Sequence, residues 1–246
     1  AQSWLAPPYV MRTGAPEDAI AAAPHQIEGR IRIGGQEHFY LEGQAALAIP
    51  GEDGDVTLLC SSQHPSEIQH KCARVIGLPY NAVTVEVRRM GGGFGGKESQ
   101  GNLPACAAAL VAAKTGRPVK VVYDRDDDMM LTGKRHDFRI DYCAGVDADG
   151  RILGLIVDHA LRCGMSWDLS EPIGDRAMFH ADNAYFLPNA QVTSYRCRTH
   201  TQSNTAFRGF GGPQGMLGMA RVIDHIAAQS GRDPLAVRRA KIYAPR

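Results

Sequence analysis

Five of the six residues from 91 to 96 are glycine, the exception is Phe94, and Lys97 and Glu98 follow directly. Each glycine costs about 0.5 to 1 kcal/mol relative to alanine in regular structure, so this run indicates unusual backbone angles or close approach of the backbone to another group. Exposed N–H groups in such a turn can hold an anion or a cofactor. A second glycine–aromatic segment occupies residues 203–214. The two segments together suggest two walls of one site.

The glycine run matches two nucleotide-binding fingerprints, and both matches are weak. A phosphate loop needs Ser or Thr after the lysine to hold magnesium, but this chain has Glu98, whose charge opposes a bound phosphate. A dinucleotide fold needs an acidic residue about 20 positions further on, and Asp124 falls somewhat late. A third interpretation is a loop that lays its backbone against a different cofactor, with Phe94 and Glu98 facing a substrate.

The elements that position these loops are a mixture of strands and helices. Gln63 lies between a predicted strand and a predicted helix, which is a favoured place for ligand contacts, although it could also be a turn residue that satisfies the backbone. The pattern predicts mixed sheets with packed helices, which is an α+β fold. The periodicity and the turn residues predict strands over residues 27–33, 56–60, 83–87 and 119–123, a hairpin of 138–146 with 152–159, and helices over 66–76, 103–114, 216–230 and from 234 onward.

The domain prediction follows from the same pass along the chain. Residues 1–23 have no clear period and are expected to be a linker or the tail of a preceding domain, leaving 24–246 as one domain. Residues 124–128 are a charge run, and most such runs are solvated surface. Residues 164–174 are predicted to be loop, followed by a short helix or turn over 175–183.

Composition narrows the function classes. The chain has 246 residues, 44% of them hydrophobic and 22% charged, with a net charge of +1, and this near-neutral balance argues against nucleic acid as a partner. No apolar run approaches the length of a membrane span and no signal peptide is legible, so we expect a cytoplasmic protein without a membrane partner. The six widely spaced cysteines read as buried thiols. The histidines lack metal-ligand spacing, so any metal must come with its own ligands.

Three motifs in order carry a resemblance to a known family. Residues 34–42, 91–98 and 206–214 resemble the molybdenum-cofactor subunit of the xanthine dehydrogenase and aldehyde oxidase family, and the likeness extends over about residues 25–243. The resemblance implies the first molybdopterin-binding domain of a molybdenum hydroxylase. It also implies molybdenum held by the pterin, water-derived oxygen, and electrons passed to 2Fe-2S clusters and FAD on another subunit or region.

The resemblance also implies roles for the residues that line the cofactor. Gln63 would contact the apical oxo side of the molybdenum. Backbone groups around Phe94, Gly95 and Arg208 would contact the cofactor, with Phe94 and Arg208 near the metal. A backbone role agrees with the glycines, because side chains would hold the ligand away.

Substrate roles follow in the same way. Glu98 and Arg176 resemble the pair found in xanthine enzymes and imply oxidation of hypoxanthine and xanthine to urate, since a guanidinium can stabilise negative charge that develops on a purine ring. Phe210 would stack on the flat heterocycle, with Ala206 and Phe207 beside it. Alternatively, Arg176 forms only a surface ion pair with Asp175, and the phenylalanines are core anchors. Other functions left open are an aldehyde oxidase or other N-heterocycle hydroxylase, and a non-catalytic nucleotide-binding module.

The family's catalytic glutamate and its second molybdopterin-binding half are not recognisable before Arg246. The iron–sulfur and FAD parts are not recognisable either. We therefore expect the complete enzyme, an oligomer by resemblance, to be active, and these 246 residues alone to have no turnover and to hold molybdopterin weakly or not at all.

Overall fold

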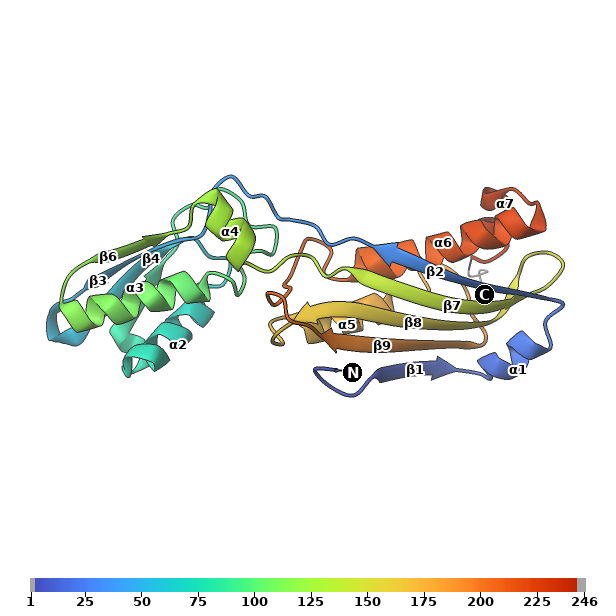
Figure 1. Cartoon of the computed structure of the whole chain (residues 1–246), viewed down its shortest axis with the longest axis horizontal. Coiled ribbons are helices and arrows are strands. Elements are labelled where there is room, and N and C mark those ends of the chain that lie inside the picture. The colour runs from blue at the N-terminus through green and yellow to red at the C-terminus, as the bar shows by residue number, and fades with distance from the viewer. Residues whose placement is uncertain (1–2, 243–246) are drawn as a thin grey trace. The chain divides into compact units, whose positions relative to one another are not determined.

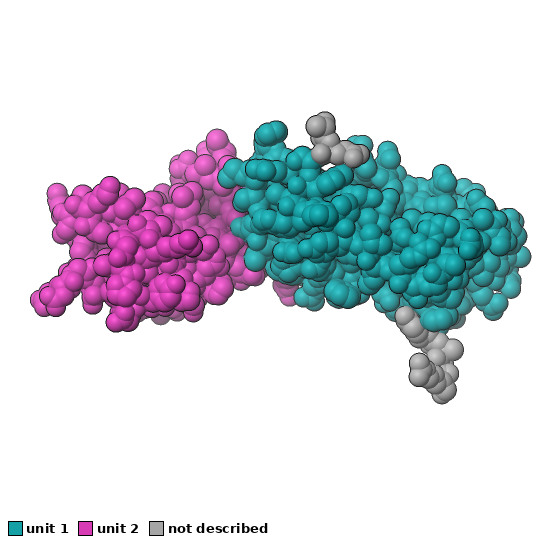
Figure 2. Space-filling model, turned by 90° about the horizontal axis from the view of Figure 1, so that it is seen from below, with its two compact units in different colours: residues 1–36, 136–201, 209–246 teal, residues 37–135, 202–208 magenta. Residues whose placement is uncertain are grey.

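The computed structural model describes residues 3–242, which form two compact units (Figures 1 and 2). Within that range, unit 1 consists of the residues up to 36, residues 136–201 and the residues from 209 onward, and unit 2 consists of residues 37–135 and 202–208. Each unit has its own sheet and its own hydrophobic core. The predicted α+β class with mixed sheets and packed helices is confirmed. None of the helices within residues 3–242 is long and apolar enough to span a bilayer.

Unit 2 is built on a mixed four-stranded sheet of order β5-β4-β3-β6 (Figure 1). β4 and β5 run parallel and are joined through α2, whereas β3 pairs antiparallel with β4 and β6. The elements are β3 (Ala45–Pro50), β4 (Val56–Cys60), α2 (Pro65–Ile76), β5 (Val83–Glu86), α3 (Asn102–Thr115), β6 (Val119–Val122) and α4 (Arg125–Leu131), with 3₁₀ turns at Glu52–Gly54 and Tyr80–Ala82.

Helices α2 and α3 bury their inner faces on this sheet. Four fully buried alanines of α3 are good helix formers, and their small side chains let the helix approach the strands closely. α2 begins with Pro65, whose missing N–H is not needed in a first turn, and ends at Gly77 in the left-handed conformation. The loops between β4 and α2 and between β5 and α3 therefore start from a rigid layer.

Unit 1 contains a five-stranded mixed sheet of order β1-β9-β8-β7-β2. β7 and β8 form the predicted hairpin, and Gly150 closes its turn in the left-handed conformation. The apolar side of α6 packs on this sheet through residues such as Ile223 and Ile226, and α5 lies against β9. The elements are β1 (Tyr9–Thr13), α1 (Pro16–Ala21), β2 (His25–Ile33), β7 (Phe138–Val146), β8 (Ile152–Gly164), α5 (Ser170–Phe179), β9 (Ala190–Arg198), α6 (Gly212–Ser230) and α7 (Pro234–Arg239).

The structure differs from the sequence-based expectations in four places. The expected linker contains β1, which pairs antiparallel with β9, and α1, which packs on β8, so this part of residues 1–23 belongs to unit 1. The expected single domain over 24–246 divides into the two units. α5 starts at Ser170, inside the predicted loop, because Ser170 is completely buried beside His136.

The charge run is the fourth difference, and it matters for the site. Residues 125–131 form α4, whose N-cap Asp124 accepts a hydrogen bond from the Asp127 amide at 2.8 Å. Asp128 is 1% exposed, not solvated. Its carboxylate accepts hydrogen bonds from the Tyr40 hydroxyl (2.6 Å) and the Gln44 amide (2.8 Å). A buried carboxylate needs such partners, and the local sequence did not reveal them.

Candidate functional site

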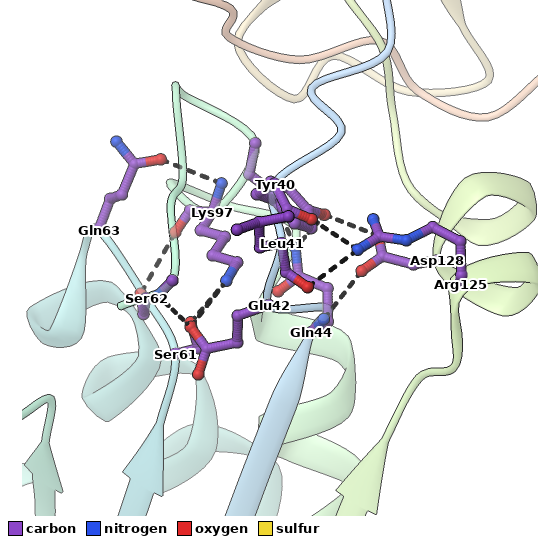
Figure 3. Close-up of polar contacts among 12 residues, drawn as sticks. Tyr40, Leu41, Glu42, Gln44, Ser61, Ser62, Gln63, Lys97, Arg125 and Asp128 are labelled. Atoms are coloured by element: carbon purple, nitrogen blue, oxygen red, sulfur yellow. Dashed lines mark hydrogen bonds and ion pairs between the residues drawn. The ribbon is translucent and has the colours of Figure 1, made fainter. Parts of the chain in front are cut away.

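Gln63 stands where the sequence places it, after β4 and before α2, and its side chain has two different ends (Figure 3). Its Oε1 accepts hydrogen bonds from the amides of Gly95 (2.9 Å) and Lys97 (3.2 Å). The backbone amide of Gln63 donates to the Lys97 carbonyl at 2.8 Å. Because two N–H donors fix which end is the oxygen, Nε2 faces away from the loop as an outward-directed donor. Gln63 therefore satisfies the backbone and also offers a hydrogen bond to a ligand.

The glycine loop and residues 203–208 of the second glycine–aromatic segment lie against each other within unit 2. The Arg208 amide donates to the Phe94 carbonyl at 2.9 Å. Phe94 has a φ of 52° and is 47% exposed. A Cβ on Gly95, where φ is 99°, would lie 2.8 Å from the carbonyl carbon of Ala206. Only glycine fits this close approach, which leaves the exposed turn at Phe94 as the surface presented to a ligand.

A buried polar cluster supports the loop from below (Figure 3). Lys97 is completely buried, and its Nζ donates to Ser61 Oγ at 2.7 Å and to Glu42 Oε2 at 3.1 Å. The same Glu42 oxygen accepts from the Gly91 amide at 2.8 Å and from Ser61 Oγ at 2.7 Å. The ammonium also lies 4.6 Å from the centre of the Tyr40 ring. Burial lowers the pKa of Lys97, while the hydrogen bond to Glu42 opposes that shift.

Gln44 forms a second support for the loop. Its Nε2 donates to the Gly96 carbonyl at 3.0 Å and to the Tyr40 hydroxyl at 2.9 Å. The Tyr40 hydroxyl donates in turn to Asp128. Burial and the neighbouring Asp128 carboxylate raise the pKa of Tyr40, so this phenol stays protonated as a donor. The alternation of His38, Tyr40 and Glu42 suggests a further strand, but residues 37–44 form a loop that supplies these groups.

The wall of Ala206, Phe207 and Arg208 is also held by named contacts. His38 Nε2 donates to the Ala206 carbonyl at 2.6 Å, and its ring stacks on Phe207 at 4.7 Å between centroids. The Arg135 guanidinium lies 3.9 Å from the Phe207 ring centre and donates to the Arg208 carbonyl at 2.8 Å. The Nε and Nη1 atoms of Arg135 are buried without a hydrogen-bond partner among the described residues. These unpaired donors favour an anionic group nearby.

Glu98 is half-buried, and its amide donates to the Gly95 carbonyl at 3.3 Å. The Gly96 amide is used in the same way, by the Gly93 carbonyl at 2.7 Å. The loop amides of Gly95 and Lys97 point at Gln63, and α3 begins only at Asn102. These amides form hydrogen bonds within the protein, so the expectation that they are exposed to hold an anion is wrong. The nucleotide-binding interpretation depended on those exposed amides and therefore loses its main support.

Arg176 and Phe210 both belong to unit 1, where the residues that follow Phe210 pack on α5. Phe210 has a φ of 52°, and the next residue, Gly211, has a φ of 91° with no room for a side chain against the Ile173 carbonyl of α5. A Cβ on Gly212 would lie 3.6 Å from Arg176 Nε. The loop after Arg208 is thus seated on the helix that carries Arg176. Arg176 is exposed, and its neighbour Asp175 pairs with the buried Arg196 instead.

The donor set suits a group that carries its own metal ligands. Among residues 3–242, no three His, Cys, Asp or Glu side chains gather in a way that could hold a metal ion. The site instead offers an outward carboxamide at Gln63, an exposed glycine-flanked turn at Phe94, and unpaired guanidinium donors at Arg135. These groups can hydrogen-bond an organic, anionic cofactor and approach it closely. The residues present therefore fit molybdopterin.

Sequence reasoning missed the supporting residues of the site. These are Tyr40, Glu42, Gln44 and Asp128. Their roles depend on partners far along the chain: Gln44 and Asp128, for example, are 84 residues apart. No local pattern reports such partners. The one local signal is Lys97, a charged residue that directly follows the glycine run.

Comparisons with known proteins agree on the family. The family described as "Molybdopterin cofactor-binding domain" matches residues 5–242. The chain is 47% identical over 236 residues to a xanthine dehydrogenase of Drosophila pseudoobscura pseudoobscura, covering 96% of this chain and 18% of that protein. It is 45% identical over 242 residues to a xanthine dehydrogenase/oxidase of Mus musculus, covering 98% and 18%. The aldehyde oxidoreductase structure from Desulfovibrio gigas superposes with a TM-score of 0.83 at 27% identity, covering 97% of this chain and 26% of that one.

Proposed function

The chain belongs to the molybdopterin cofactor-binding domain family, and we propose that it is the first cofactor-binding part of a molybdenum hydroxylase that oxidises hypoxanthine and xanthine to urate. The chain spans 18% of the length of the xanthine dehydrogenases it matches. The observation that carries the proposal is the fixed carboxamide of Gln63 beside the glycine loop. When bound, the molybdenum cofactor supplies the transfer of a water-derived oxygen to carbon and the removal of two electrons.

The residues of unit 2 have binding roles in this proposal. Gln63 Nε2 would donate a hydrogen bond to the bound molybdenum cofactor, and the glycines beside Phe94 would allow the backbone to approach it. The amide of Arg208 holds the Phe94 carbonyl, which fixes the turn. The Gln63 segment and the glycine loop both follow strands of the helix-covered sheet of unit 2. Their donors are therefore in position before a ligand binds, as electrostatic preorganisation requires.

The substrate roles rest on Glu98, Arg176 and Phe210. Glu98 accepts hydrogen bonds from purine ring N–H groups, or donates to a ring nitrogen when protonated. Arg176 stabilises the negative charge that develops on the ring, which raises kcat because the charge is largest in the transition state. Phe210 stacks on the flat ring, and Ala206 and Phe207 lie beside it. The exposure of Arg176 and its lack of an ion pair with Asp175 support this assignment.

The complete enzyme in this proposal contains further parts. A second molybdopterin-binding half would close the site and carry the catalytic glutamate, other parts would hold the 2Fe-2S clusters and FAD that take up the electrons, and the enzyme would be an oligomer. We place it in the cytoplasm and in purine catabolism. The six free thiols suit a reducing compartment. On its own, the 246-residue chain has no turnover and retains no stoichiometric molybdenum, which metal analysis of the purified chain tests.

An aldehyde oxidase, or a hydroxylase of another N-heterocycle, is the alternative within the family. Similarity to the Desulfovibrio gigas aldehyde oxidoreductase supports the shared chemistry. Glu98 and Arg176 favour a purine, since an aldehyde has no ring nitrogens to bind and develops its charge on one oxygen.

Replacement of Arg176 with Met in the complete enzyme separates these functions. We expect kcat/KM for xanthine to fall by about 100-fold, the usual scale for losing a charge-stabilising donor, while benzaldehyde oxidation is unchanged or faster. The exposed Arg32→Met is the control and is expected to change neither. Unchanged xanthine hydroxylation in Arg176→Met would contradict the purine assignment.

A further inference from the structure

Lys97 is the most unusual side chain beneath the glycine loop. It is completely buried, although lysine is rarely buried unless it is paired. Removing an ammonium from water costs free energy, so a buried ammonium needs hydrogen-bond acceptors and a nearby negative charge. Glu42 and Ser61 receive its hydrogen bonds, and the Tyr40 ring lies beside it.

The backbone of Lys97 connects this buried ammonium directly to Gln63. The Lys97 amide donates to Gln63 Oε1 at 3.2 Å, and the Lys97 carbonyl accepts from the Gln63 amide at 2.8 Å. Its carbonyl also accepts a long hydrogen bond from Ser62 Oγ at 3.4 Å. A displacement of the Lys97 backbone would therefore remove one of the two hydrogen bonds that hold Gln63 Oε1 and the bond that holds the Gln63 backbone amide.

The far end of the loop is tied to the same carboxylate. Glu42 Oε2 accepts from the Gly91 amide at 2.8 Å, and the Glu42 amide donates to the Gly91 carbonyl at 3.2 Å. The loop from Gly91 to Lys97 is thus clamped at both ends on one Glu42–Lys97 pair (Figure 3). The five glycines give this loop many possible backbone conformations and no side chains to restrict them. The hydrogen bonds to Glu42 and Lys97 therefore fix its conformation.

We propose that Lys97 is a positioning residue that acts through Gln63: by clamping the glycine loop on Glu42 and Ser61, it keeps the Gln63 carboxamide turned with Nε2 toward the cofactor. The inference rests on the proposed role of Gln63 and adds the residue that sets its orientation. Lys97 touches neither substrate nor cofactor in this arrangement. Its effect on turnover consequently has to pass through Gln63.

That requirement gives a double-mutant cycle in the complete enzyme. Lys97→Met is expected to lower kcat by about 10- to 100-fold, the range for residues that orient a ligand-binding group, with little change in KM. In a Gln63→Glu background, whose carboxylate has no donor to orient, Lys97→Met is expected to lower kcat by less than about twofold. If the two losses multiply, Lys97 does not act through Gln63 and the proposal is overturned. The exposed Lys114→Met is the matched control.

A readout without turnover separates this inference from the proposed function. Hydrogen exchange of the Gly95 and Lys97 amides needs no cofactor, and we expect Lys97→Met to speed it by about 10-fold. Unchanged exchange would overturn the clamp even if the enzyme hydroxylates purines. Faster exchange in a protein that oxidises no purine would support the clamp and reject only the substrate assignment. If Lys97→Met does not fold, Ser61→Ala replaces it, removing one of the two Nζ acceptors, with the same expectations at smaller size.

Discussion

Asp175 receives an ion-paired hydrogen bond from Arg196, a guanidinium that is completely buried, and not from its chain neighbour Arg176. The Arg196 guanidinium also lies 3.8 Å from the centre of the Tyr9 ring. A Cβ on Gly174 would lie 3.2 Å from Arg196 Nε, so α5 is seated directly on this side chain. The surface ion pair that the sequence allowed for Arg176 is therefore wrong, and Arg176 remains available at the exposed side of α5.

Replacement of Arg196 with Met tests this arrangement. The variant removes the completely buried guanidinium together with its contacts to Tyr9 and α5, and we expect the free energy of unfolding to fall by about 3 kcal/mol. Asp175→Asn keeps a hydrogen-bond acceptor but leaves the buried Arg196 charge without its counter-ion, so it is expected to cost about 2 kcal/mol. Urea unfolding of both variants measures the difference. Equal and small losses would contradict the pairing as an anchor of α5.

Gly95→Ala tests the contact between the two loops. The methyl group would meet the Ala206 carbonyl carbon at 2.8 Å from a φ of 99°, so we expect a loss of about 3 kcal/mol. Gly116→Ala is the matched control, since Gly116 also has positive φ but nothing within 4 Å, and its cost is expected to be about 1 kcal/mol. Chemical denaturation compares them. Similar losses in both would show that conformation alone, not the close approach, requires glycine at 95.

Gln63→Glu tests the outward donor. The carboxylate can still accept hydrogen bonds from the Gly95 and Lys97 amides, so the melting temperature is expected to change little. It cannot donate toward the cofactor, and we expect kcat of the complete enzyme to fall by about 100-fold. Gln36→Glu on an exposed loop is the control. Full activity in Gln63→Glu would rule out a donor role for Nε2.

His159 predicts a pH dependence of stability. It is 1% exposed on β8, its Nδ1 has no partner among the described residues, and burial lowers its pKa to about 4. Between pH of about 6.5 and 4 the unfolded chain binds a proton that the folded chain excludes, so stability is complete above this window and falls as the pH drops through it.

The size of that effect is set by the lowered pKa. The shift from 6.5 to about 4 corresponds to a loss of about 3 kcal/mol by the low end of the window. His159→Gln should flatten the fall, whereas the exposed His200→Gln should not. Urea unfolding at a series of pH values measures the slopes. A slope that persists in His159→Gln would assign the effect to other groups.

Local periodicity was sufficient for much of the fold. Strand β4 and the β7–β8 hairpin follow their alternation closely, and α2 begins at its proline and ends at Gly77. β9 was not predicted, because its nine residues mix Tyr195, Arg196 and Cys197 without clear alternation. β1 was missed because its pairing with β9 joins residues about 180 positions apart, which no window of sequence contains.

The site residues show the same difference between local patterns and long-range contacts. The position of Gln63 followed from one strand and one helix, and the glycines indicated close backbone approach before any contact was known. The burial of Lys97 and Asp128 depends on long-range partners and therefore could not be predicted. Charged residues are surface residues in most proteins, and only the completed fold supplies the partners that make them buried ones.

The source of the oxygen in the product distinguishes hydroxylation with water from other oxidations. The complete enzyme is incubated with xanthine in water labelled with the heavy oxygen isotope, and the product is analysed by mass spectrometry. The proposed function predicts urate that carries one labelled oxygen from water, and about 100-fold less of this product from Arg176→Met at the same enzyme concentration and time. Absence of urate from the wild-type enzyme, or urate whose new oxygen comes from unlabelled dioxygen, would contradict it.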